Sequence, residues 1–104
     1  MSDLTKGERH YLRGLGQRLD PVVTLGKNGL TDNVTRQIME ALNSHELIKV
    51  RFGEFKEEKE EYAEAIAKVT GCECVGMVGH VVVLYKKQAD SAKRKIRFPN
   101  TLAR

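Results

Sequence analysis

Residues 21–52, PVVTLGKNGLTDNVTRQIMEALNSHELIKVRF, decide the fold. The segment opens with a short apolar run after Pro21 and closes with residues 47–52, in which apolar and basic side chains alternate as in a strand. Between the two runs Thr31 is a natural N-cap. Its helix has a predicted buried stripe of Val34, Ile38, Ala41 and Leu42. The pattern therefore predicts strand, helix, strand, a crossover that joins parallel strands in the right-handed sense.

The flanking segments supply two more helices and a hairpin. Thr5 and Glu8 have the spacing of a capping box and predict a first helix ending near Leu15. A third helix is expected over residues 56–70, with Gly71 as its C-cap. Strands follow at 73–78 and 81–85, joined by a tight turn. The order αβαβαββ predicts an α/β fold, an α+β two-layer sandwich around a mixed four-stranded sheet.

The 104 residues are 40% hydrophobic, a length and composition typical of one globular domain. Charge is distributed unevenly along them. The net charge is +4, yet residues 86–104 carry seven Lys or Arg against one Asp, while residues 1–85 carry eleven against thirteen acidic residues. We expect a single domain over residues 1–87 and a mobile basic tail over residues 88–104, with a short extended piece at 96–98.

The sequence lacks the patterns of membrane, secreted and catalytic proteins. It has no run of 18 apolar residues and no apolar stretch at its N-terminus, so we expect a cytoplasmic protein without a membrane partner. The three histidines fall on a helix face, a helix end and a hairpin turn, and carboxylates cluster on solvated positions. We expect no enzyme, because no nucleophile is placed beside a base; a nuclease is the enzyme alternative.

Cys72 and Cys74 would point to the same face of a strand, about 7 Å apart and beyond the reach of a disulfide. A zinc site would need two further ligands, and His80 is the one neighbour of suitable type. We expect small, half-buried strand residues, with no metal and no cofactor.

The segment Gly26-Lys27-Asn28-Gly29 stands between a strand and a helix N-terminus. Glycines let the backbone approach a ligand, and the helix start presents free N–H groups with a partial positive charge. Together with Lys27 these features predict a phosphate site. Turns of this kind also join strands to helices without any ligand. The motif is neither a P-loop nor a dinucleotide fingerprint.

Basic residues elsewhere in the chain support the hypothesis that this loop binds a ligand. A G-x-x-G loop that clamps a nucleic-acid backbone is the device of KH-type RNA binders. Aromatic residues are scattered along the sequence, so we expect recognition of RNA shape and backbone rather than of stacked bases. The predicted RNA contacts are Gly26, Lys27, Asn28 and Gly29 of the loop, Lys6, Arg9 and Arg13 of the first helix, Lys49 and Arg51 of the second strand, and Lys93, Arg94, Lys95 and Arg97 of the tail.

Three motifs in this order, PVVTLGKNGLT, HELIKV and VGMVGHVVVLYKK, resemble those of the YhbY-type CRM domain family (chloroplast RNA splicing and ribosome maturation), over about residues 4–98. The resemblance is to the stand-alone bacterial members. It implies a fold similar to the C-terminal domain of translation initiation factor three, an RNA-contacting GxxG loop at residues 26–29, and ribosomal RNA and precursors of the large ribosomal subunit as partners. Asp20 departs from the family, in which a basic residue is frequent before the proline.

A protein-docking, ribosome-associated factor is the alternative reading. The third helix carries an acidic face that would suit a basic ribosomal protein, although such faces are usually only solvated. Its members are Glu57, Glu58, Glu60, Glu61 and Glu64. RNA binding and docking on opposite faces are compatible, and we expect a monomer.

Overall fold

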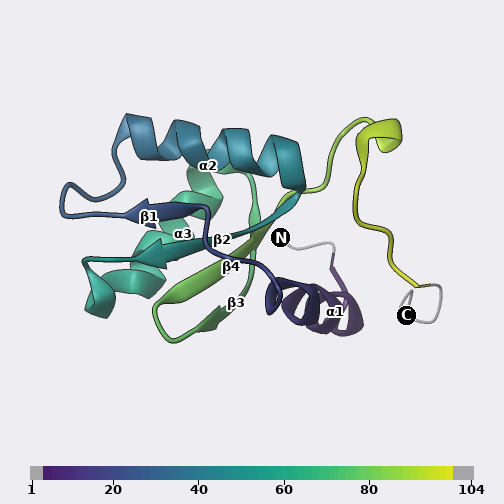
Figure 1. Ribbon diagram of the computed structural model, residues 1–104, viewed down its shortest axis with the longest axis horizontal. Coiled ribbons are helices and arrows are strands. Elements are labelled where there is room, and N and C mark those ends of the chain that lie inside the picture. Colours follow the sequence, from purple (N-terminus) through teal and green to yellow (C-terminus); the bar gives the residue numbers. More distant parts are fainter. Residues whose placement is uncertain (1–3, 100–104) are drawn as a thin grey trace.

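The computed structural model describes residues 4–99 (Figure 1). Its elements are α1 (Lys6–Gly16), β1 (Val23–Leu25), α2 (Asp32–His45), β2 (Leu47–Phe52), α3 (Lys59–Thr70), β3 (Glu73–Val78) and β4 (Val81–Tyr85). Two short 3-10 turns, η1 (Lys56–Glu58) and η2 (Ser91–Lys93), precede α3 and follow β4. The predicted order αβαβαββ is confirmed. No helix in the described part of the chain has the length and apolarity needed to cross a membrane.

The helix ends follow the capping residues in the sequence. Thr5 and Glu8 form the predicted capping box, and the Thr31 hydroxyl accepts the N–H of Val34 at 3.2 Å. Gly71 ends α3 in the left-handed conformation, as expected. The start of α3 differs from the prediction, since residues 56–58 form a 3-10 turn. The reason is local: the N-cap position holds Glu58, whose side chain makes no capping hydrogen bond.

The sheet has the strand order β1-β2-β4-β3. β1 pairs with β2 in parallel, as the first crossover predicted, whereas β4 lies antiparallel between β2 and β3. The second crossover, from β2 through α3 to β3, therefore joins two parallel strands that do not pair with each other. Composition accounts for the position of β4: its VVVLY sequence is buried along most of its length and suits the centre, while β3 carries Glu73 and Gly76 and lies at the edge.

The two faces of the sheet are covered differently (Figure 1). α2 and α3 cover one face and, with the sheet, form the two-layer sandwich. The core between them includes Leu25, Ile38, Leu42, Val50, Phe52, Ile66 and Leu84. α1 covers only part of the other face, near the Tyr85 end of β4. The smaller cluster beneath it comprises Leu12, Leu47, Val75, Val83 and Tyr85. α1 does not cover the rest of this second face, which includes Arg51, Val78 and Val81 near the turn at residues 79–80.

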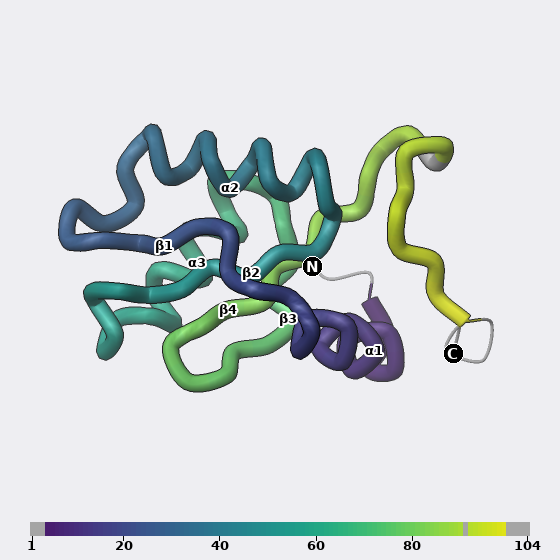
Figure 2. The backbone as a smooth tube through the Cα atoms, in the orientation of Figure 1, coloured from purple at the N-terminus to yellow at the C-terminus, as the bar shows by residue number. Residues whose placement is uncertain are grey.

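The C-terminal arm, which we define as residues 87–98, lies against the domain rather than free of it. In Figure 2 its yellow tube runs from the end of α2 toward α1. Ile96 and Phe98 pack on the smaller core cluster, and the ring of Phe98 lies 5.8 Å from that of Tyr11 and 6.2 Å from that of Tyr85. The expectation of a mobile tail is therefore wrong for these residues; residues 100–104 lie outside the described range.

Candidate nucleic-acid interface

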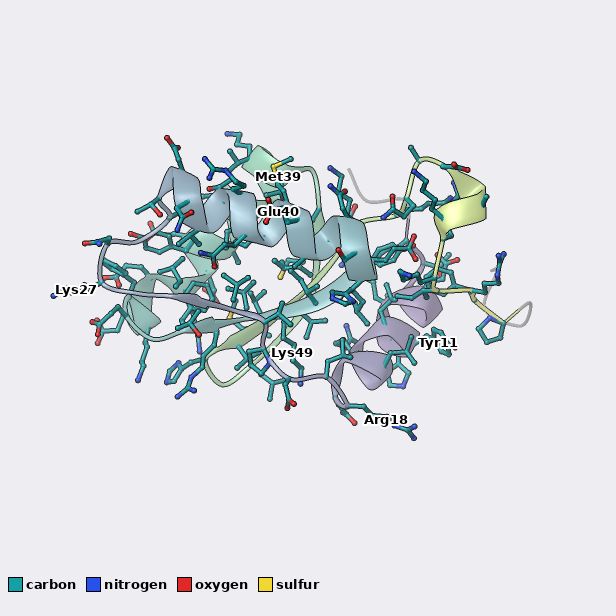
Figure 3. All side chains as sticks on the ribbon, turned by 45° about the horizontal axis from the view of Figure 1, so that its top comes forward. Tyr11, Arg18, Lys27, Met39, Glu40 and Lys49 are labelled. Atoms are coloured by element: carbon teal, nitrogen blue, oxygen red, sulfur yellow. The ribbon has the colours of Figure 1, made fainter. Side chains whose placement is uncertain are left out.

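The GKNG loop, residues 26–29, forms a tight turn at the tip of β1. The N–H of Gly29 donates to the carbonyl of Gly26 at 3.0 Å, which places Lys27 and Asn28 at the two exposed corners. Figure 3 shows Lys27 pointing away from the body of the protein. Gly29 has a φ of 74°, and a Cβ there would lie 3.2 Å from the Tyr62 hydroxyl. The turn thus depends on a glycine at this position for its conformation and its space.

The loop leads directly into the positive end of α2. The first N–H groups of a helix lack partners within the helix, and the helix dipole adds partial positive charge there. Thr31 caps this end and satisfies the N–H of Val34. Asp32, the first residue of the helix, is exposed and brings a negative charge close to the loop. An anion at this place would meet helix N–H groups and the Lys27 ammonium, with Asp32 partly offsetting their positive charge.

The aromatic side chains of Phe55 and Tyr62 pack against the GKNG loop. The rings of Phe55 and Tyr62 pack with centroids 5.1 Å apart, and both lie against Gly29. Phe55 itself has a left-handed backbone, with a φ of 58°. The carbonyl of Leu25 accepts the N–H groups of Gly53 and Glu54, which ties the ends of β1 and β2 together. Gly29 is thus packed against the domain, while Lys27 and Asn28 are exposed.

The open part of the sheet continues from the loop end toward α1. Strand pairing aligns Thr24, Arg51, Val81 and Val78 in one row across this face. In the next row Lys49 lies opposite Val83, and its ammonium donates to the Leu19 carbonyl at 3.0 Å. A groove of about 650 Å³ runs between this surface and α1, lined by His10, Arg13, Gln17, Lys49, Val78 and Val81. His10, Arg13 and Lys49 give its lining basic side chains, and Val78 and Val81 give it apolar ones.

The arginines of α1 make structural contacts with the edge strand β3. Arg9 donates to the Cys74 carbonyl and forms an ion pair with Glu73, each at 3.1 Å. Arg13 donates to the Val75 carbonyl at 3.1 Å and lies across Gly76, where a Cβ would be 2.5 Å from Arg13 Cδ. These bonds attach α1 to the strand and occupy carbonyls of a sheet edge. Lys6 is exposed.

Glu46 is a residue that the sequence patterns did not single out. It is fully buried, with a φ of 63°, where α2 turns into β2. One carboxylate oxygen, Oε1, accepts the N–H groups of Lys95 and Ile96 at 2.7 and 2.8 Å, and Oε2 accepts that of Gln88 at 2.9 Å. Its own carbonyl accepts the N–H of Lys86. Glu46 therefore fixes the arm at several points.

The electrostatics of Glu46 favour the ionised carboxylate. Burial raises the pKa of this group, but the hydrogen bonds from the backbone of Gln88, Ile96 and Lys95 and the charge of Arg94 outweigh it, so that the pKa is below its ordinary value. Arg94 in turn donates to the Gln88 carbonyl at 2.9 Å. Lys93, Lys95 and Arg97 are exposed on the same segment. The arm thus turns its backbone inward and three cationic side chains outward.

The predicted site residues do not form one continuous patch. The register pairs Leu25 with Phe52, and Phe52 donates to the His80 carbonyl, so the GKNG loop lies at one end of the sheet. Lys49 and Arg51 follow on the open face, and the arm lies at the opposite end of the molecule (Figure 1). The structure therefore separates the cations into a loop, a sheet surface and an arm.

Cys72 immediately precedes β3, and Cys74 lies within it. Cys72 is buried and Cys74 half-buried, and burial raises the pKa of both thiols, which keeps them protonated and poorly nucleophilic. Residues 4–99 contain no group of three side chains arranged to hold a metal ion. The five glutamates of the third helical segment are all exposed, as predicted.

Comparison with known proteins gives consistent matches. The model of the CRS1 / YhbY (CRM) domain matches residues 4–86. The chain is 42% identical to an RNA-binding protein of Haemophilus influenzae, over 95% of this chain and 98% of the relative. It is 36% identical to Probable RNA-binding protein YqeI of Bacillus subtilis, over 92% and 99%. The solution structure of the Staphylococcus aureus protein SAV1595 is similar with a TM-score of 0.75 and 32% identity, over 90% and 99%.

Proposed function

The chain belongs to the CRS1 / YhbY (CRM) domain family, and we propose that it binds ribosomal RNA through the GKNG loop and assists assembly of the large ribosomal subunit. The observation that best supports the RNA contact is the tight turn of the GKNG loop at the positive end of α2, with Lys27 exposed at its corner. A phosphate at this place would receive helix N–H groups and a mobile ammonium. The ribosomal target rests on the family resemblance.

The relatives support RNA as the ligand, since one is named RNA-binding protein and another Probable RNA-binding protein. The positions of the aromatic rings favour recognition of backbone and shape. Phe52 and Tyr85 are buried, Tyr11 packs with Phe98, and Phe55 packs with Tyr62. These six rings are therefore grouped into packing contacts, although they are scattered in sequence. Base-stacking platforms need exposed ring faces, so a folded RNA is the better fit.

Lys27→Ala is expected to weaken RNA binding about fivefold, which corresponds to the loss of about 1 kcal/mol from one charged phosphate contact. The thermal unfolding midpoint should not change, because the side chain is exposed at a turn corner. Fluorescence anisotropy with a labelled ribosomal RNA fragment measures the affinity. Lys68→Ala, an exposed lysine of α3, is the matched control and should bind as the wild type does. Equal losses in the two variants would show that only net charge matters.

Co-sedimentation tests the biological target. The protein should travel with immature large-subunit particles at low salt and largely leave them at about 0.5 M salt, because counterions replace its phosphate contacts. Cells without the protein should accumulate incompletely processed large-subunit RNA. Association with small subunits alone would reject the target. Association with the particles by a protein that does not bind naked RNA at low salt would instead favour docking on a basic ribosomal protein through the acidic face of α3.

A further inference from the structure

The backbone of the C-terminal arm is held on the domain at several points. The buried carboxylate of Glu46 accepts three backbone N–H groups of the arm, and these hydrogen bonds hold the segment in place. Ile96 and Phe98 anchor the far end of the arm on the domain. Between these contacts the side chains of Lys93 and Lys95 point into solvent. The backbone that carries these two charges therefore has a defined position, and the chain segment need not become ordered when an anion binds.

Helix α2 separates the arm from the GKNG loop. The loop precedes the first turn of α2, and Glu46 is its C-cap, so one helix connects the two basic surfaces. Its 14 residues span about 21 Å. The cationic arm also lies at the negative end of the helix dipole, where positive charge is stabilised. Figure 1 shows the loop and the arm at opposite ends of the long axis, along which the molecule extends 42 Å.

From this arrangement we infer that the protein grips a folded RNA at two separated places, the GKNG loop and the C-terminal arm, and that Glu46 is the positioning residue for the second contact. The inference rests on the proposed RNA binding and adds the kind of RNA. Double-stranded RNA-binding domains span about 16 base pairs, which is comparable to the length of this protein. A helical RNA of that length reaches both surfaces, whereas a short hairpin reaches one.

Proteolysis tests the role of Glu46 without RNA. In Glu46→Gln the amide nitrogen must face at least one of the N–H donors of Gln88, Lys95 or Ile96, whichever way the amide is turned. The arm should open more often, and trypsin should cleave after Lys93, Arg94, Lys95 or Arg97 at least about tenfold faster than in the wild type. Unchanged cleavage of the arm would overturn the positioning role.

Binding to two RNA hairpins tests the second contact. With a stem of about 16 base pairs, Lys93→Ser/Lys95→Ser and Glu46→Gln should each bind at least about tenfold more weakly than the wild type. With a stem of about six base pairs, all three proteins should bind alike, because only one surface is engaged. Lys56→Ser/Lys68→Ser removes the same charge from exposed sites outside the arm and should match the wild type on both stems.

The outcomes separate this inference from the proposed function. If the arm variant binds the long stem as tightly as the wild type does, or if the Lys56→Ser/Lys68→Ser control loses as much affinity, the two-place grip is wrong while RNA binding stands. If the wild type binds neither stem, RNA binding itself fails. The arm variant changes only exposed side chains, so its result does not depend on whether Glu46→Gln folds fully.

Discussion

Replacing Lys27 and Asn28 together by Asp is expected to abolish RNA binding and to leave the domain folded. Both positions are exposed turn corners, where Asp is readily accommodated. The change puts two carboxylates beside Asp32 at the place proposed for a phosphate. Like charges about 4 Å apart repel by about 1 kcal/mol in water and about 4 kcal/mol near a protein surface. An affinity loss of at least about a hundredfold follows, since 1.4 kcal/mol corresponds to a factor of ten.

Fluorescence anisotropy on a ribosomal RNA fragment measures this loss, and circular dichroism checks that the thermal midpoint is unchanged. Lys68→Glu/Val69→Glu is the matched control, because it alters the net charge by the same amount at two neighbouring exposed residues of α3. That control should lose little affinity. A loop variant that binds within threefold of the wild type would mean that the GKNG segment is only a turn.

Local signals in the sequence were sufficient for the elements of this fold. The T-x-x-E spacing at Thr5, the cap at Thr31 and the αL position of Gly71 each act within a few residues. β2, β3 and β4 have the predicted bounds, because alternation and turn residues are local too. Strand order is not local. The position of β4 between β2 and β3 reflects its burial on both faces of the completed sheet.

The candidate site was predictable in part for the same reason. The GKNG loop is a local feature and appears at the expected junction. Arg9 and Arg13 were predicted as RNA contacts of the first helix, but they donate to carbonyls of β3 more than sixty residues away. Glu46 follows a helix and has no pattern that distinguishes it from a solvated glutamate. Only the folded chain brings residues 88 and 95–96 to its carboxylate.

The ordering of the arm leads to a second large effect, on stability. Deleting residues 88–104 removes the three N–H donors of Glu46 and uncovers the apolar cluster under Ile96 and Phe98. Hydrogen bonds to charged groups contribute about 1.5–3 kcal/mol each, and the conformational entropy of the freed arm offsets part of the loss. We expect the free energy of unfolding to fall by about 2–3 kcal/mol and the thermal midpoint by about 10–20 °C.

The same deletion should change the dependence of stability on pH. Because the folded-state pKa of Glu46 lies below its unfolded value, its contribution is fully present above the ordinary carboxyl pKa and is lost as the pH falls through the lower folded value. Without the arm the carboxylate meets water and this contribution disappears. Urea unfolding should therefore show a stability gap between the two chains that is constant near neutral pH and narrows below about pH 4.5. The control deletes only residues 100–104, which retains Glu46 and its partners, and this chain should be as stable as the full chain at every pH. Equal stability of the 1–87 chain and the full chain would refute the structural role of the arm.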